Sequence, residues 1–96
     1  MSPLKRKKLS KIRFELDKLD NSLMKVIKKR TNLVKKVLAL KDKKNQIIDQ
    51  KRITKILNNI KKKSLKNNID PKITNRIWKN MIWAYIDFEK RNFKKK

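Results

Sequence analysis

The feature that most constrains this chain is a long stretch of helical periodicity that runs from Leu9 to about Lys44. Apolar residues recur there at intervals of three and four, at Ile12, Leu16, Leu19, Leu23, Ile27, Val34 and Val37. This spacing marks one face of an α-helix. Because the stretch contains no Gly or Pro, nothing in it forces an early end. We therefore predict an N-terminal helix of about thirty residues, about 45 Å long at the α-helical rise.

A second, shorter helix is predicted to follow Asp49, since Asp is a favoured N-cap residue. The connection before it, residues 42–48, is polar and then apolar, and we place the break around Asn45-Gln46. The Asn67-Asn68 pair suits the end of this helix, because Asn tolerates the left-handed conformation. Its apolar residues repeat with helical spacing at Ile53, Ile56, Leu57 and Ile60.

A third helix is predicted to restart at Asp70-Pro71, where Asp is the N-cap and Pro takes the first helical position. Its apolar positions are Ile73, Ile77, Trp78, Met81, Ile82, Tyr85 and Phe88. We expect one helical domain over residues 9–92, between a basic, disordered tail at 1–8 and a basic tail at 93–96.

The unequal lengths of these helices predict an assembly. The chain of 96 residues has no Gly and two Pro, which nearly excludes a turn-rich β fold and indicates an all-α protein. Two shorter helices cannot cover the apolar stripe of one so long. An intertwined homodimer, with the long helix of one chain packed on that of its partner, would cover the stripe.

Composition also excludes several kinds of chemistry. Without Cys there are no disulfides or thiolate metal ligands, and without His the commonest general base and zinc ligand are absent. We therefore do not expect an ordinary hydrolase triad or a zinc enzyme. No apolar run reaches transmembrane or signal-peptide length, so we expect a cytoplasmic protein with no membrane partner.

The formal net charge of +23 invites a nucleic-acid interpretation. However, Lys provides 25 of the 31 cations, and Lys, Asn and Ile together make up about half of the chain. A joint excess of these three residues is typical of A/T-rich codon usage, and Lys recurs around the helix rather than in one patch. We therefore do not expect nucleic-acid binding as the main role, and keep a basic helical protein that binds nucleic acid or another partner as a distant alternative.

Four cations have a spacing that suggests an anion site. On an ideal helix Arg30 and Lys41 lie about 16 Å apart and within about 20° of the same face, so both side chains reach a small anion between them. Arg13 lies about 25 Å from Arg30 along the axis and reaches only the partner's ligand, if the long helices run antiparallel. Two composite sites per dimer would follow, with Arg52 folded over each.

Any one of these cations is also compatible with a solvated helix face. Residue type favours a site, because only six of the 31 cations are Arg and three of those are Arg13, Arg30 and Arg52. The planar fork of Arg is suited to gripping carboxylates.

A longer pattern connects these positions. It reads Ile12-Arg13-x-x-Leu16-Asp17-x-Leu19-Asp20-x-x-Leu23, Lys29-Arg30, Val37-x-x-Leu40-Lys41, Asp49-x-x-Arg52, Ile69-Asp70-Pro71, Ile77-Trp78-x-x-Met81-Ile82 and Glu89. Over residues 9 to 92 the chain resembles the all-helical chorismate mutase family. The resemblance implies an intertwined three-helix dimer with shared active sites, which rearranges chorismate to prephenate without cofactor, metal or covalent intermediate.

The resemblance also implies a role for each residue. Chorismate is a dianion, and Arg13 of the partner subunit and Arg30 would clamp its carboxylates while Arg52 completes the positive pocket. Lys41 would donate to the ether oxygen as it gains negative charge in the transition state. Glu89 stands where the family often has Gln, and donates only when protonated. We therefore expect better activity at acidic pH, unless burial holds the proton on Glu89 near neutrality.

Two departures from the family pattern keep a second reaction open. Ile53 stands where the mutases usually have a Glu that accepts from the ring hydroxyl, and Tyr85 stands where they often have Ser. Both resemble the isochorismate-pyruvate lyase branch of the same fold. Against the lyase, Asp49 offers a backbone or side-chain group that could recognise the ring hydroxyl of chorismate in place of the missing Glu. We favour the mutase, and also consider a mutase fold kept as a regulatory or partner-binding subunit.

Overall fold

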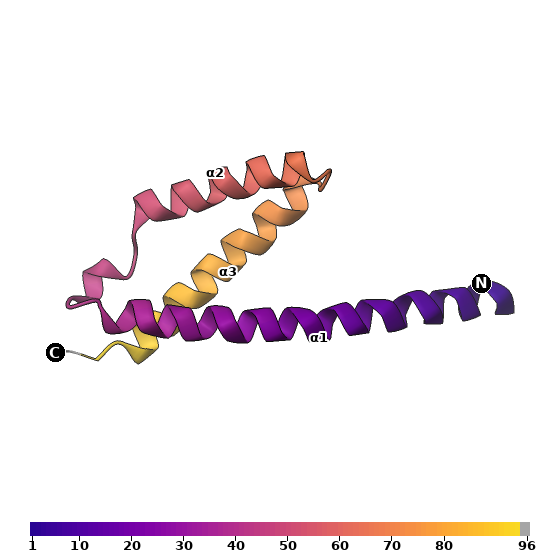
Figure 1. The fold of residues 1–96 in the computed structure, drawn as a ribbon, viewed down its shortest axis with the longest axis horizontal. Coiled ribbons are helices and arrows are strands. Elements are labelled where there is room, and N and C mark those ends of the chain that lie inside the picture. Colours follow the sequence, from indigo (N-terminus) through magenta and orange to yellow (C-terminus); the bar gives the residue numbers. More distant parts are fainter. Residues whose placement is uncertain (95–96) are drawn as a thin grey trace. The chain divides into compact units, whose positions relative to one another are not determined.

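The computed structural model describes residues 1–94 and contains three α-helices and one short 3₁₀-helix (Figure 1). In chain order these are α1 (Pro3–Ala39), η1 (Lys44–Gln46), α2 (Gln50–Lys66) and α3 (Pro71–Asn92). The described residues include no strand, so the predicted all-α class with one long and two shorter helices is confirmed. The chain divides into two compact units, Met1–Leu33 and Val34–Lys96.

The long helix begins earlier than predicted. We expected residues 1–8 to be a disordered tail, but α1 starts at Pro3. The reason lies in the two preceding positions of the sequence. The Ser2 hydroxyl accepts a hydrogen bond from the Lys5 backbone N–H at 3.2 Å, and Pro3 occupies the first turn. An N-cap Ser followed by Pro is a helix start signal. The predicted start was later because the apolar periodicity begins only at Leu9.

The unit Met1–Leu33 has no core of its own. None of its residues is buried. Along the predicted apolar stripe the exposed fractions are 55% for Ile12, 52% for Leu16, 65% for Leu19 and 55% for Leu23. Exposed rows of this kind on a helix usually have a packing partner. The homodimer that would supply one stays a prediction.

The long helix also ends earlier than predicted, at Ala39 rather than near Lys44. Its last turn tightens, since the Leu40 and Lys41 N–H groups donate to the carbonyls three residues earlier, at 3.0 and 3.1 Å. The next two N–H groups, of Asp42 and Lys43, donate instead to the Gln46 side chain at 2.8 and 2.9 Å. A helix continuing through these residues would need those donors for its own carbonyls. Lys41 therefore follows the helix instead of lying on it.

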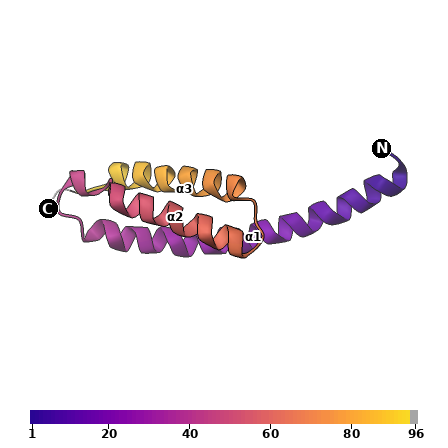
Figure 2. The ribbon, with the colours of Figure 1, turned by 90° about the horizontal axis from the view of Figure 1, so that it is seen from above.

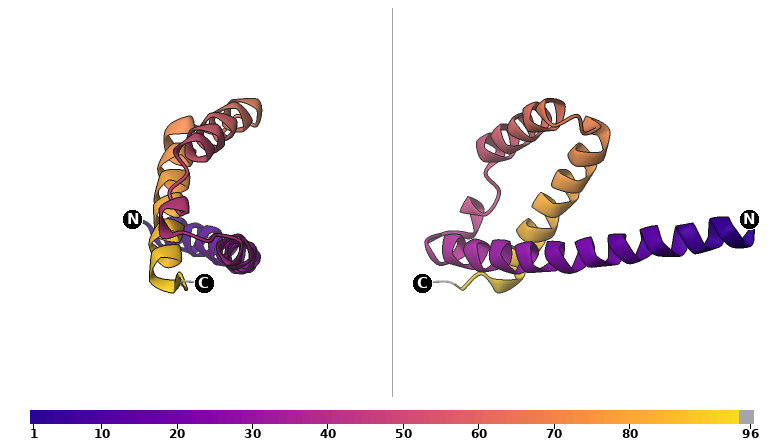
Figure 3. Two further views of the ribbon diagram at one scale, coloured as in Figure 1. Left: turned by 90° about the vertical axis from the view of Figure 1, so that its left-hand side faces the viewer. Right: turned by 45° about the vertical axis from the view of Figure 1, so that its right-hand side comes forward.

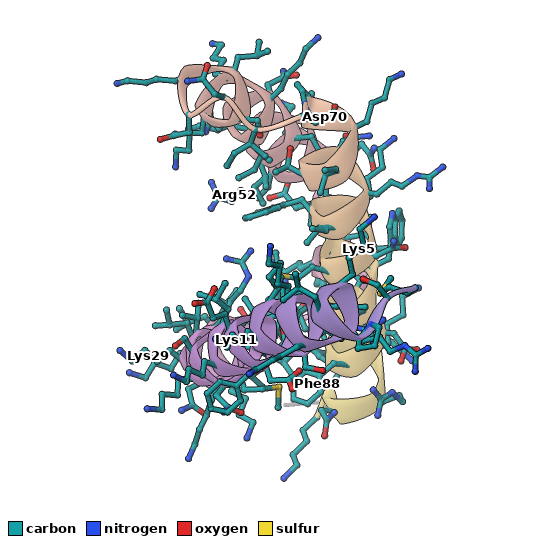
Figure 4. All side chains as sticks on the ribbon, turned by 90° about the vertical axis from the view of Figure 1, so that its right-hand side faces the viewer. Lys5, Lys11, Lys29, Arg52, Asp70 and Phe88 are labelled. Atoms are coloured by element: carbon teal, nitrogen blue, oxygen red, sulfur yellow. The ribbon has the colours of Figure 1, made fainter. Side chains whose placement is uncertain are left out.

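The boundaries of α2 and α3 agree with the prediction. Asp49 accepts from the Arg52 N–H at 3.1 Å and begins α2. Asn67 ends α2, and Asn68 takes the left-handed conformation with φ 56°. Asp70, labelled at the head of α3 in Figure 4, accepts from the Lys72 N–H at 2.9 Å, and Pro71 is the first helical residue. Local capping chemistry thus determines both starts.

Helices α2 and α3 form a hairpin within the unit Val34–Lys96. They run antiparallel and side by side in Figure 2, and Figure 3 shows the short turn that joins them. Next to that turn the hydroxyls of Ser64 and Thr74, both buried, share a hydrogen bond of 2.6 Å. This bond satisfies two polar groups that would otherwise be costly to bury.

A small apolar cluster packs the other end of the hairpin against the connection from α1. Its members come from four different segments, and are Leu38, Ile47, Ile53, Ile82 and Ile86. Ile47, in the connection, is the most buried of the five, with 3% exposed. Within residues 1–94, none of the helices combines the length and apolar composition that a membrane span requires. The C-terminal tail predicted at 93–96 follows α3, and its last two residues lie outside the described part.

Candidate active site

The most distinctive polar contact in the unit Val34–Lys96 joins two residues 48 positions apart. The Lys41 Nζ donates to Glu89 Oε1 at 3.1 Å, and the two side chains are 18% and 7% exposed. Bonds between opposite charges are stronger than neutral ones, and more so where water is excluded. Both residues were sequence candidates, and the structure brings them together.

Each partner of this pair is delivered by a different feature of the fold. Lys41 lies two residues beyond the end of α1, after the buried anchor Leu38. Glu89 lies in the last turns of α3, one turn after the buried Ile86. Residues three apart on a helix share a face. Glu89 therefore lies on the face of α3 that packs into the core, and its carboxylate contacts Lys41 there.

Ile53 and Tyr85 lie in the same unit as the ion pair. Ile53 is 8% exposed and belongs to the apolar cluster, so its side chain is a core residue in this structure. It has no atom that accepts a hydrogen bond. Tyr85 is half-buried on α3, four residues before Glu89 and hence on the same helix face.

Asp49 and Arg52 occupy the start of α2, and both are exposed. One carboxylate oxygen of Asp49 is used as the N-cap, since it accepts from the Arg52 backbone N–H. This bond fixes the first turn from which the Arg52 side chain projects (Figure 4). Asp49 thus caps α2, as the sequence predicted. Its suggested recognition of a ring hydroxyl stays a prediction.

Arg13 and Arg30 belong to the other unit, Met1–Leu33. Arg13 is exposed, whereas Arg30 is half-buried. The Nε atom of Arg30 is buried and has no hydrogen-bond partner among the described residues. A buried donor left unpaired costs about 1–3 kcal/mol, so such an atom calls for an acceptor from elsewhere. The meeting of these two arginines with the Lys41–Glu89 pair stays a prediction.

Sequence reasoning overlooked one residue of this region, Gln46, whose side-chain oxygen holds the two backbone N–H groups that follow Lys41. A Gln in a polar connection gives no signal of its own, because its partners depend on how the loop folds. Within the described residues, no group of three or more His, Cys, Asp or Glu side chains could hold a metal ion.

Comparison with known protein families gives a match over most of the chain. The family model described as chorismate mutase type II matches residues 12–90, which is most of the chain and includes every candidate residue named above. No curated protein and no solved structure matches.

Proposed function

The chain belongs to the chorismate mutase type II family, and we propose that it rearranges chorismate to prephenate at a site centred on Lys41 and Glu89. At the level of the family it is an isomerase of the chorismate mutase type that acts on chorismate. The observation that supports the specific site is the Lys41–Glu89 ion pair, which puts a buried carboxylate and an ammonium group in contact.

Lys41 is proposed to stabilise the transition state. As the C–O bond of chorismate breaks, negative charge develops on the ether oxygen. The ammonium group of a Lys has three N–H donors, and one of them is directed at Glu89. The ion pair restricts the Lys41 side chain, so the remaining donors are oriented before the substrate arrives. Preorganised donors of this kind are worth about 100- to 1,000-fold in kcat.

Glu89 is proposed to have two roles that depend on its protonation. As a carboxylate it accepts from Lys41 and orients it, which is the arrangement in this structure. To donate to the ether oxygen it must carry a proton. We therefore propose that the rate rises toward acidic pH. A rate that is constant from about pH 5 to about pH 8 would show that Glu89 does not donate.

The arginines are proposed to bind the two carboxylates of chorismate and so hold the conformer in which the reacting carbons meet. Arg30 has a buried Nε that an anionic ligand would satisfy. Arg52 projects from a capped first turn, and Arg13 of the partner subunit would complete the pocket. This part of the proposal is supported by the family pattern and by the suitability of Arg for carboxylates.

The shared site requires the homodimer, which the exposed stripe of α1 supports. Mixing two inactive variants tests both ideas at once. A chain with Arg13→Ala and a chain with Lys41→Met each lack one contribution to every site of their own dimers. Mixed dimers contain one intact site, so random exchange should restore about one quarter of the native activity. Absence of recovery, with exchange verified by mass spectrometry, would exclude sites shared in this way.

A second reaction, elimination of pyruvate from isochorismate, is favoured by Ile53. Its buried side chain cannot accept from a ring hydroxyl, and isochorismate carries that hydroxyl elsewhere on the ring. Incubation of the protein with each substrate at about pH 5 and about pH 7.5, with products separated by chromatography, distinguishes the two. Prephenate from chorismate supports the mutase. Salicylate and pyruvate from isochorismate, with little prephenate, supports the lyase.

A cytoplasmic location belongs to the same proposal, and cell fractionation followed by the prephenate assay tests it.

If neither substrate is turned over by a folded helical dimer, the alternative of a fold retained as a partner-binding subunit takes its place.

A further inference from the structure

The connection between α1 and α2, which lies at the left of Figure 1, contains two hydrogen bonds from a side chain to the backbone just after Lys41. A single oxygen, Gln46 Oε1, accepts from two consecutive backbone N–H groups, those of Asp42 at 2.8 Å and Lys43 at 2.9 Å. The backbone N–H of Gln46 in turn donates to the Lys43 carbonyl at 3.0 Å. The bond from the Lys43 N–H to the Gln46 side chain corresponds to one half of a capping box, and the return bond is made to the Lys43 backbone carbonyl.

This arrangement decides where α1 ends. In a longer helix the Asp42 and Lys43 N–H groups would donate to the carbonyls of Leu38 and Ala39. Gln46 takes both donors, so the helix stops and its last turn tightens to the three-residue spacing. Each residue added to an α-helix turns the chain by about 100°. A shift in the end of α1 would therefore redirect Lys41, which lies two residues beyond that end.

Both ends of this segment are held by the apolar cluster, whereas Lys41 itself is not. Leu38 is 9% exposed on one side, and Ile47 is 3% exposed on the other. Between these anchors the Lys41 side chain makes its contact with Glu89. Gln46 is exposed, so its side chain contributes hydrogen bonds to the loop rather than packing to the core.

We propose that Gln46 is a positioning residue for Lys41, acting through the two backbone N–H groups that it holds. The consequence for catalysis rests on the proposed function. Only an acceptor oxygen at the right distance is needed, so Glu should replace Gln and Met should not. A small displacement of a catalytic donor lowers the rate strongly. We therefore expect Gln46→Met to lower kcat about tenfold while KM changes less than about twofold.

The test compares kcat and KM for chorismate in the native protein and in Gln46→Met and Gln46→Glu. Gln46→Glu should restore kcat to within about twofold, because a carboxylate also accepts from backbone N–H groups. Gln46→Asn keeps the amide but withdraws its oxygen by one methylene, so it should resemble Gln46→Met even if the latter folds poorly. A kcat unchanged in both Gln46→Met and Gln46→Asn would overturn the proposal.

Asn67→Ala is the matched control. It removes a side-chain bond of 2.7 Å to the Lys63 carbonyl at the end of α2, another exposed contact of an element terminus. It should alter thermal stability slightly and leave kcat unchanged. A tenfold loss in this variant as well would mean that kcat reports general loosening, which would overturn the specific role of Gln46.

A second measurement separates this inference from the proposed function. The ¹⁵N signal of the Lys41 ammonium group, assigned by its loss in Lys41→Arg, reports on the ion pair without any substrate. It should shift or broaden in Gln46→Met and return in Gln46→Glu. This result would support the positioning role even in a protein inactive on chorismate, and an unchanged signal in Gln46→Met would overturn it.

Discussion

The two units of this chain use helices in different ways. In Met1–Leu33 no side chain is buried, and the apolar stripe of α1 faces solvent. In Val34–Lys96 five apolar side chains form a cluster, and a partly buried ion pair joins Lys41 to Glu89. The first unit presents arginines and an exposed apolar surface, for which we predict a second chain as the packing partner. The second positions its own catalytic candidates.

The largest expected effect concerns the ion pair of the unit Val34–Lys96. Lys41→Met removes the donor to the ether oxygen, and we expect kcat for chorismate to fall by about 100-fold or more. Lys36→Met is the matched control, because Lys36 is an exposed cation in the last turn of α1. Circular dichroism should show that both variants keep their helices. Equal activity in the two variants would remove Lys41 from the mechanism.

The next prediction contrasts apolar residues of the two units. Ile86→Ala opens a cavity in the cluster and should lower the free energy of unfolding by about 2–5 kcal/mol. Leu19→Ala, on the exposed stripe, should instead weaken dimerisation and lower the melting temperature, most of all at low protein concentration. Chemical denaturation and sedimentation measure these effects. If Leu19→Ala left self-association unchanged, the stripe would need a different partner.

A smaller effect is expected at the ion pair. Glu89→Gln replaces an acceptor-only carboxylate by an amide that donates at every pH. Because the amide donates without first taking up a proton, kcat at about pH 7.5 should be at least as high in the variant as in the native protein. The measurement is kcat at saturating chorismate. A lowered kcat in Glu89→Gln would show that the contact of the carboxylate with Lys41 matters more than a second donor.

The smallest effect concerns the start of α1. Ser2→Ala removes the cap that receives the Lys5 N–H, which should cost about 1 kcal/mol of local helix stability. Hydrogen exchange should then quicken in the first turns while activity stays the same. Ser10→Ala, inside the helix, provides the control. Slow exchange in both variants would mean that contacts other than the cap hold this end.

Local chemistry explains which parts of the fold were predictable. The starts of α2 and α3 follow from Asp49 and from Asp70-Pro71, since each cap lies within three residues of the N–H it satisfies. The start of α1 at Ser2-Pro3 also depends on neighbouring residues alone. The prediction placed it at Leu9 because the apolar periodicity begins there.

The end of α1 could not be predicted from neighbouring residues alone. It depends on the Gln46 side chain, which competes for donors that a helix would otherwise use, and such competition is settled only when the loop folds. For the same reason Lys41 was placed on the helix although it follows the end.

By itself the sequence determined the helical class, the two internal caps and the residue types suited to an anion. The tertiary structure alone decided that Lys41 meets Glu89 and that Ile53 enters the core. The pattern of one helix cannot specify a contact between residues 48 positions apart, because that contact depends on how separate segments pack.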